Sequence, residues 1–166
     1  MKVLVTGATG FVGSRLCERL RQRGDTVVAL SRDGASARRR VAALEHAYTW
    51  DPLAEPAASE AFAGVDAVVH LLGEPVAGRW TAAKKRLIFD SRVLGTRNLV
   101  EAISKLDVKP KVLVSSSAMG YYGDRGEEQL TEESSAGEGF TSEVCRAWER
   151  EALRVEPLGV GLARLR

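Results

Sequence analysis

The sequence predicts an α/β domain built on a parallel sheet, and two observations carry that prediction. Short apolar runs alternate with longer amphipathic runs along the whole chain, which is the pattern of successive βα units. A glycine-rich turn, Thr6 to Gly13, joins the first apolar run to the first amphipathic run. Right-handed crossovers then predict a doubly wound sheet in the strand order 3-2-1-4-5-6, covered by helices on both faces in three αβα layers.

The first half of the chain supplies three strands and the segments between them. Residues 2–6, with the apolar run Val3-Leu4-Val5 at their centre, form the first strand. Residues 11–23 space their apolar side chains along one face of a helix, and Gly24 ends that helix. The further elements expected in this half are a strand at 26–30, a helical segment at 35–45, a strand at 46–50 and a short helix at 53–62.

The second half begins with a strand at 67–72 that is apolar on both faces, as a central strand of a parallel sheet should be. A long helix is expected from Thr81, a suitable N-cap, to about Leu106. The remaining elements expected are a strand at 112–115, a polar, glycine-rich segment at 116–139, a helix at about 141–155 and a strand at 159–165.

The composition excludes several classes of protein. The chain has 166 residues, of which 45% are hydrophobic and 28% charged, as in an ordinary globular domain. No run approaches the roughly 18 apolar residues of a membrane-spanning helix, and the net charge of +2 does not indicate a nucleic-acid partner. Cys17 and Cys145 fit neither a metal site nor a disulfide framework. We therefore expect a cytoplasmic protein without a metal, membrane or nucleic-acid partner.

The glycine-rich turn has the spacing of a dinucleotide-binding fingerprint between a strand and a helix. Gly7 allows the tight turn, Gly10 allows backbone N–H groups to approach a pyrophosphate, and Gly13 allows the helix to pack closely on the sheet. The start of the helix contributes free N–H donors and a partial positive charge. This turn makes the predicted fold Rossmann-type. The predicted cofactor contacts in it are Gly7, Thr9, Gly10, Phe11 and Val12.

The end of the second strand decides between the two nicotinamide cofactors. An acid at that point would bind the ribose 2′-hydroxyl of NAD, whereas this chain has Ser31 followed by Arg32. A serine hydroxyl can donate to a 2′-phosphate, and a guanidinium can bind it through two parallel hydrogen bonds. Asp33 stands near the spacing of the NAD acid and is the competing candidate. We predict NADP as the cofactor.

With these residues in place, the chain resembles the extended and atypical branch of the short-chain dehydrogenase/reductase superfamily. Within that branch it is most similar to the epimerase family proteins of the NAD-dependent epimerase/dehydratase group. The resemblance extends over essentially all 166 residues. It is carried by the Thr6–Gly13 turn, Asp51-Pro52, His70-Leu71-Leu72-Gly73, Glu74-Pro75, Arg79-Trp80-Thr81, Asp90-Ser91-Arg92-Val93, Gly95-Thr96, Ser117 to Gly123, Phe140-Thr141 and Trp148-Glu149.

The resemblance implies further cofactor contacts. It assigns the 2′-phosphate to Ser31 and Arg32, and it places Arg92 near the nicotinamide half of the cofactor. From the sequence pattern alone, Arg92 could instead belong to a plain helix surface. The other residues that the resemblance places along the cofactor are Asp51, Leu71, Leu72 and Gly73.

Hydride transfer in this superfamily rests on a serine after the fifth strand and on a tyrosine four residues before a lysine, which moves a proton. We choose Ser117 as the serine because it matches the family position. The tyrosine–lysine pair is absent: an alignment on Phe140 pairs it with Val144, and an alignment on Thr141 pairs it with Cys145. Tyr121 is our candidate for a substitute proton donor, although packing of Tyr121 and Tyr122 under the loop is the interpretation that the sequence slightly favours.

Two functions follow as alternatives. The first is an NADP-dependent oxidoreductase or sugar-nucleotide epimerase of atypical mechanism, which would act on a small carbonyl compound or sugar nucleotide. The second is a non-catalytic NADP(H)-binding or sensor module. We expect residues 1–166 to be the cofactor-binding part of a longer protein whose substrate lobe follows, and we allow for a homodimer.

Overall fold

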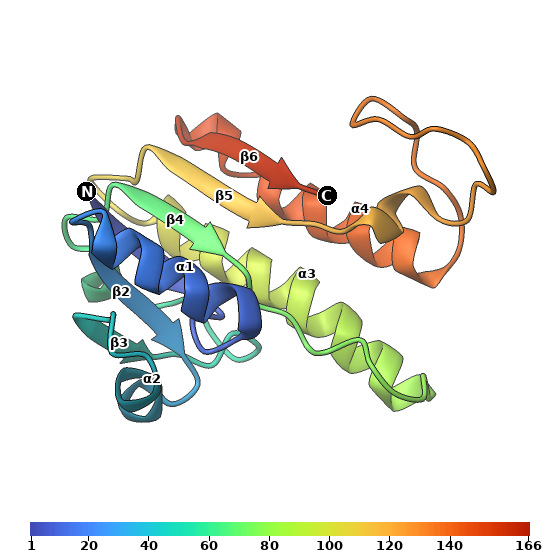
Figure 1. Cartoon of the computed structure of the whole chain (residues 1–166). Helices are drawn as coiled ribbons and strands as arrows, with labels where there is room; N and C mark the ends of the chain where they lie inside the picture. Colours follow the sequence, from blue (N-terminus) through green and yellow to red (C-terminus); the bar gives the residue numbers. More distant parts are fainter.

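The computed structural model describes residues 1–166 and contains one six-stranded parallel sheet in the order β3-β2-β1-β4-β5-β6 (Figure 1). The strands are β1 (Lys2–Thr6), β2 (Thr26–Ser31), β3 (His46–Thr49), β4 (Ala67–His70), β5 (Val112–Ser116) and β6 (Gly161–Leu165). The helices are α1 (Phe11–Gln22), α2 (Gly34–Arg40), α3 (Ala82–Ser104) and α4 (Phe140–Leu153). Short 3-10 turns are η1 (Ser59–Phe62), η2 (Met119–Tyr122) and η3 (Glu156–Leu158). The predicted fold class and strand order are confirmed.

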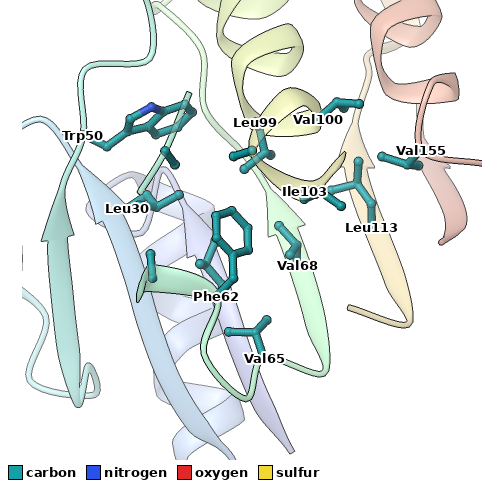
Figure 2. Packing of buried hydrophobic residues seen from close by; sticks show 14 of the residues in the cluster. Leu30, Trp50, Phe62, Val65, Val68, Leu99, Val100, Ile103, Leu113 and Val155 are labelled. Carbon is teal, nitrogen blue, oxygen red and sulfur yellow. The ribbon is translucent and has the colours of Figure 1, made fainter. Parts of the chain in front are cut away.

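Two apolar clusters, one on each face of the sheet, hold the three layers together. On one face, Cys17 and Leu20 of α1 and Ala37 of α2 pack against β1 and β2. On the other face, α3 covers β4 and β5, and Figure 2 shows its residues Leu99 and Ile103 among the buried side chains of this larger cluster. Figure 1 shows α1 in front of the sheet and α3 behind it. The open crevice between the two halves therefore lies at the carboxyl ends of β1 and β4.

The predicted helix at 53–62 is wrong, and the reason lies in its first residues. Asp51 accepts a hydrogen bond from the N–H of Leu53 at 3.0 Å, which forms a turn instead of a helix start. Pro56 then prevents a helix from continuing because it has no N–H to donate, and only the short η1 forms, at Ser59–Phe62.

The helix α2 and the strand β4 also end earlier than expected. The helix α2 ends at Arg40 because the next residue, Val41, adopts an extended conformation and buries its side chain in the core. The strand β4 ends at His70, so that Leu71 and Leu72 lie in the loop after its carboxyl end rather than inside the strand.

The helix α3 connects several parts of the molecule. Thr81 caps it by accepting from the N–H of Lys84 at 3.2 Å, as predicted from the sequence. Further along, Thr96 contacts the buried His70, and the side chain of Asn98 donates to the carbonyl of Pro52 at 2.9 Å. No helix of the protein, α3 included, combines the length and the apolar character that a membrane crossing requires.

Candidate functional site

A cleft of about 490 Å³ lies at the carboxyl ends of β1, β2 and β4. Nine of the predicted cofactor residues line it: Gly7, Thr9, Gly10, Ser31, Arg32, Asp51, Leu71, Leu72 and Gly73. The remaining lining residues were not predicted as site residues: Ala8, Leu30, Pro52, Leu53, Glu74, Pro75, Leu87 and Ser91. The fold therefore brings residues from four separate loops to one concave surface.

The glycine turn has the tight geometry that its spacing predicts. Gly7 has a φ of +69°, and a Cβ there would lie 2.8 Å from the carbonyl oxygen of Leu71. A Cβ on Gly13 would lie only 2.2 Å from the carbonyl oxygen of Gly7, so only glycine fits where α1 meets the turn. A Cβ on Gly10 would lie 3.2 Å from the carbonyl oxygen of Gly7 and would otherwise point into open space.

The helix α1 begins at this turn without a side-chain cap. The helices α2 and α3 both have one, from Asp33 and Thr81. Because the first N–H groups of a helix find no acceptor within it, those of α1 remain free to bind an anion. Phe11 and Val12 are 89% and 62% exposed and do not line the cleft, so a contact with a cofactor there would have to come from their backbone N–H groups.

The end of β2 gives the two candidate ribose contacts different surroundings. Arg32 lines the cleft, is exposed and pairs with no carboxylate. Asp33, the competing acid, caps α2: its Oδ1 accepts from the N–H of Ser36 at 2.8 Å. The carboxylate of Asp33 thus has a structural role, and it lies outside the lining of the cleft.

The loop after β4 forms the opposite wall of the cleft. The N–H of Leu71 donates to the Thr6 carbonyl at 3.3 Å and to the Thr6 hydroxyl at 3.2 Å, which fixes the start of the loop. Leu72 packs on Gly95 of α3, where a Cβ would lie 3.1 Å from its Cδ2. Two leucines therefore present an apolar wall to the cleft.

Glu74 organises the far end of this loop. Its N–H donates to the Ser91 hydroxyl at 2.9 Å, its carbonyl accepts from Arg92 at 3.0 Å, and its carboxylate pairs with Lys84 at 2.6 Å. The sequence analysis placed Glu74 in a family segment but gave it no role.

The α3 side of the cleft is formed by Leu87 and Ser91. Their spacing in the sequence was a signal for this, since residues four apart share a helix face.

Arg92 lies behind Gly73 rather than in the cleft lining. A Cβ on Gly73 would lie 2.9 Å from the guanidinium carbon, and the ring of Trp148 lies 5.3 Å from the same carbon. Burial lowers the pKa of Arg92 from its ordinary value. The guanidinium is thus packed between the cleft loop and α4, and it is not part of a plain helix surface.

Ser117 is held by a buried carboxylate. Its hydroxyl donates to Oε1 of Glu149 at 2.7 Å, and Glu149 also accepts from Arg164 and Arg166. Burial opposes the charge of Glu149, but the hydrogen bonds from Arg166 and Ser117 and the charges of both arginines outweigh it and lower its pKa. The single proton of the Ser117 hydroxyl is therefore engaged within the protein.

Neither Tyr121 nor the residues at the tyrosine–lysine positions form a proton-transfer pair. The ring of Tyr121 stacks on the Arg166 guanidinium, 3.7 Å from its centroid. Phe140 packs edge-on against Trp80. Cys145 is buried, and burial raises its pKa. The structure brings no lysine to Tyr121.

His70 has a structural role. It is fully buried, with Nδ1 2.7 Å from the Thr6 hydroxyl and Nε2 2.9 Å from the Thr96 hydroxyl. Burial lowers its pKa to about 4, so the ring is neutral near neutral pH.

Comparison with known proteins assigns the family. Residues 3–146 match the model of the NAD dependent epimerase/dehydratase family. The chain belongs to that family. The family assignment agrees with the resemblance found in the sequence, and it accounts for the Rossmann-like sheet with its glycine turn.

Two curated relatives are epimerase family proteins. The SDR39U1 homolog, chloroplastic, of Arabidopsis thaliana is 38% identical over 157 residues, 93% of this chain and 45% of its own length. Epimerase family protein YfhF of Bacillus subtilis is 35% identical over 162 residues, 96% of this chain and 52% of its own length. This chain spans about half the length of such relatives.

Solved structures show the same fold. A nucleoside-diphosphate sugar epimerase from Corynebacterium glutamicum is 36% identical, with a TM-score of 0.80 over 100% of this chain and 33% of its own. The human epimerase family protein SDR39U1, solved with NADPH, is 31% identical, with a TM-score of 0.76 over 92% of this chain and 48% of its own. A UDP-glucuronic acid 4-epimerase from Bacillus cereus, solved with NAD, is 23% identical and supports the fold alone.

Proposed function

We propose that the cleft binds NADP(H), and that the chain is the cofactor-binding part of an oxidoreductase or epimerase with an atypical proton-transfer mechanism. One observation carries the proposal: the uncapped start of α1 opens onto the same cleft as Ser31 and Arg32. The NADPH in the human relative supports the choice of cofactor.

The residues present fit such a cofactor. The free N–H groups of α1 would bind the pyrophosphate, and Ser31 with Arg32 would bind the 2′-phosphate. Asp51 would lie near the adenosine half, and Leu71, Leu72 and Gly73 would line the path toward the nicotinamide. The cofactor, when bound, would accept or supply a hydride.

Ser117 and Tyr121 are our candidates for substrate contact because they follow the carboxyl end of β5. The Ser117 hydroxyl could donate to a substrate oxygen only by leaving Glu149, which stays charged because Arg164 and Arg166 remain bound to it. As arranged, Ser117 accepts a hydrogen bond more readily than it donates one. A substrate hydroxyl fits this arrangement.

The hydrogen bond from Ser117 to Glu149 favours a second function, a non-catalytic NADP(H)-binding or sensor module. The engaged Ser117 proton and the absent tyrosine–lysine pair both remove parts of the usual proton path. A hydride-exchange assay separates the two functions. The full-length protein is incubated with NADPH deuterated at C4 and a panel of carbonyl compounds, and separately with NADP+ and sugar nucleotides deuterated at the reacting carbon. Transfer of label supports an enzyme, and tight NADPH binding without any transfer supports the module.

Cofactor choice is tested by thermal-shift titration with NADPH and NADH. We expect a larger shift with NADPH, and saturation at 100 times the dissociation constant should stabilise the fold by about 2.7 kcal/mol. Arg32→Gln should weaken NADPH binding by at least about tenfold, since it removes a charge-assisted pair of hydrogen bonds. Asp33→Asn is the matched control because asparagine also caps a helix. Equal shifts with both cofactors, or a loss of NADH binding in Asp33→Asn alone, would contradict the assignment.

Two other sequence predictions remain proposals. We propose a cytoplasmic location, in keeping with two cysteines that are both free in the structure. We also propose that the full-length protein forms a homodimer, which light scattering of the purified protein would test.

A further inference from the structure

Arg92 differs from the other partly buried arginines in having no salt bridge. Three arginine side chains are not exposed: Arg92, Arg125 and Arg166. Arg125 pairs with Glu128 and Arg166 pairs with Glu149, each at 2.8 Å or less. Arg92 forms no salt bridge, although burial lowers its pKa and so disfavours its charge. A partly buried charge without a counter-ion costs stability. Such a residue is therefore a candidate for binding an anionic ligand.

The guanidinium of Arg92 is fixed by its neighbours. Nη1 donates to the carbonyls of Glu74 and Ile88, at 3.0 and 3.2 Å. Gly73 and Trp148 lie against the group, as described above. A guanidinium held at one nitrogen and packed against two residues is oriented before any ligand arrives.

Two other arginines of the protein show what the Nε–Nη2 edge of a guanidinium can bind. Arg166 binds the carboxylate of Glu149 through Nε and Nη2, with one nitrogen on each oxygen, and Arg97 donates from the same two nitrogens to one oxygen of Glu151. In Arg92 the donor that bonds to protein acceptors is Nη1, and the Nε–Nη2 edge has no acceptor within the protein. This edge presents two parallel donors, which match the two oxygens of a carboxylate.

We propose that the Nε–Nη2 edge of Arg92 binds the carboxylate of a small organic acid beside Gly73, between the cleft loop and α4. A single negative charge fits, because Lys84, the other cation that contacts Glu74, is already paired with the Glu74 carboxylate. The ligand is distinct from the cofactor phosphates, for which the start of α1 and Arg32 are the proposed contacts. As a statement about the substrate, the inference rests on the proposed function. As a statement about binding, it can be tested without the cofactor.

Trp148 offers a direct readout. Its indole lies next to Arg92, and its buried N–H has no hydrogen-bond partner within the protein. The chain has three tryptophans, so a nitrogen–proton correlation spectrum should show three indole signals, with Trp80→Phe and Trp50→Phe identifying two of them. Sodium acetate is the probe, and acetamide, which has the same shape without the charge, is the matched control. Both are titrated at constant ionic strength.

The proposal predicts a saturable shift of the Trp148 signal with acetate and none with acetamide. Arg92→Gln should weaken the acetate response by at least about tenfold, since a charged donor pair is lost. Arg92→Lys should restore part of it. Arg86→Gln, an exposed position on the same helix, should respond as the wild type does. No saturable acetate shift in the wild type, or an unchanged one in Arg92→Gln, would overturn the proposal.

The cofactor is tested separately in the same variants. If NADPH binding is unchanged in Arg92→Gln while acetate binding is lost, the carboxylate site and the cofactor site are distinct. If Arg92→Gln instead loses NADPH and keeps acetate binding, Arg92 is a cofactor contact and the carboxylate site is refuted. If the wild type binds acetate but neither nicotinamide cofactor, the proposed function fails while the carboxylate site stands.

Discussion

The Nε2 atom of His70 lies 2.9 Å from the hydroxyl oxygen of Thr96, which ties the central strand β4 to α3 across the buried face of the sheet. On its other side, the same ring contacts Thr6 of β1 at 2.7 Å. A neutral imidazole can donate from one nitrogen and accept at the other, so it satisfies both threonines without carrying a charge.

This arrangement predicts a pH dependence of stability. The pKa of His70 is about 4 in the fold, below its ordinary value of 6.5, so the unfolded chain binds more protons between these values. The His70 contribution is fully present above pH 6.5 and is lost as the pH falls toward 4. We expect the free energy of unfolding to fall by roughly 2 kcal/mol between pH 7 and pH 4.5. Urea denaturation at the two pH values measures it.

The control for this measurement is the second histidine. His46→Gln, at an exposed position, should keep the pH dependence, whereas His70→Gln should flatten it although it lowers stability at pH 7. A pH dependence that persists in His70→Gln would assign it to another group.

The glycine turn predicts opposite outcomes for two similar substitutions. Gly13→Ala should destabilise the fold by at least about 3 kcal/mol, since its Cβ has no room beside the Gly7 carbonyl. Gly10→Ala should cost about 1 kcal/mol at most, because its backbone conformation suits alanine. Its Cβ would instead stand in the open space of the cleft and weaken NADPH binding by at least about tenfold. Chemical denaturation and cofactor titration together measure both effects. Undiminished NADPH binding by Gly10→Ala would place the pyrophosphate elsewhere.

Gly73 and Arg92 should be energetically coupled. Gly73→Ala brings a Cβ within 2.9 Å of the guanidinium, so it should displace Arg92 and lower stability. In an Arg92→Ala background the same substitution has room and should cost much less. A double-mutant cycle should therefore give a coupling of about 1 kcal/mol or more. Additive effects would show that the guanidinium moves aside freely.

Glu149 should be important for stability. Glu149→Gln removes the charge that neutralises Arg164 and Arg166, and it should cost about 3 kcal/mol. The pKa of Glu149 is lower in the fold than in the unfolded chain. Its contribution to stability is therefore present above the ordinary pKa of a glutamate and is lost as the pH falls through the lowered pKa. Glu143→Gln, on the exposed side of the same helix, should change stability little. Denaturant titration of the two variants at pH 7 makes the comparison.

The strand order could be predicted because it follows from local patterns and a general rule of handedness. The glycine turn could be predicted because all its constraints lie within Thr6 to Gly13. The helix expected at 53–62 failed because Pro56 and the Asp51 turn, both visible in the sequence, outweigh its apolar pattern. Both determinants of this segment are therefore local in the sequence.

Other features of the site could not be predicted from local patterns. Ser117 and Glu149 are 32 residues apart, and only the packing of α4 against β5 brings them together. The positions of Arg92 and Gly73 similarly depend on how α3 crosses the end of β4. Both relationships decide what the site can do, and both arise from tertiary packing.

The contacts of α3 also set a limit on how this protein can change in length. Inserting one residue into a helix turns everything beyond it by about 100° and moves it by about 1.5 Å. A single insertion near Leu87 would therefore move Ser91 from the cleft, Thr96 from His70 and Asn98 from Pro52 in one step. Insertions and deletions should be tolerated in the surface loop at 124–136, and selected against throughout the segment 87–98.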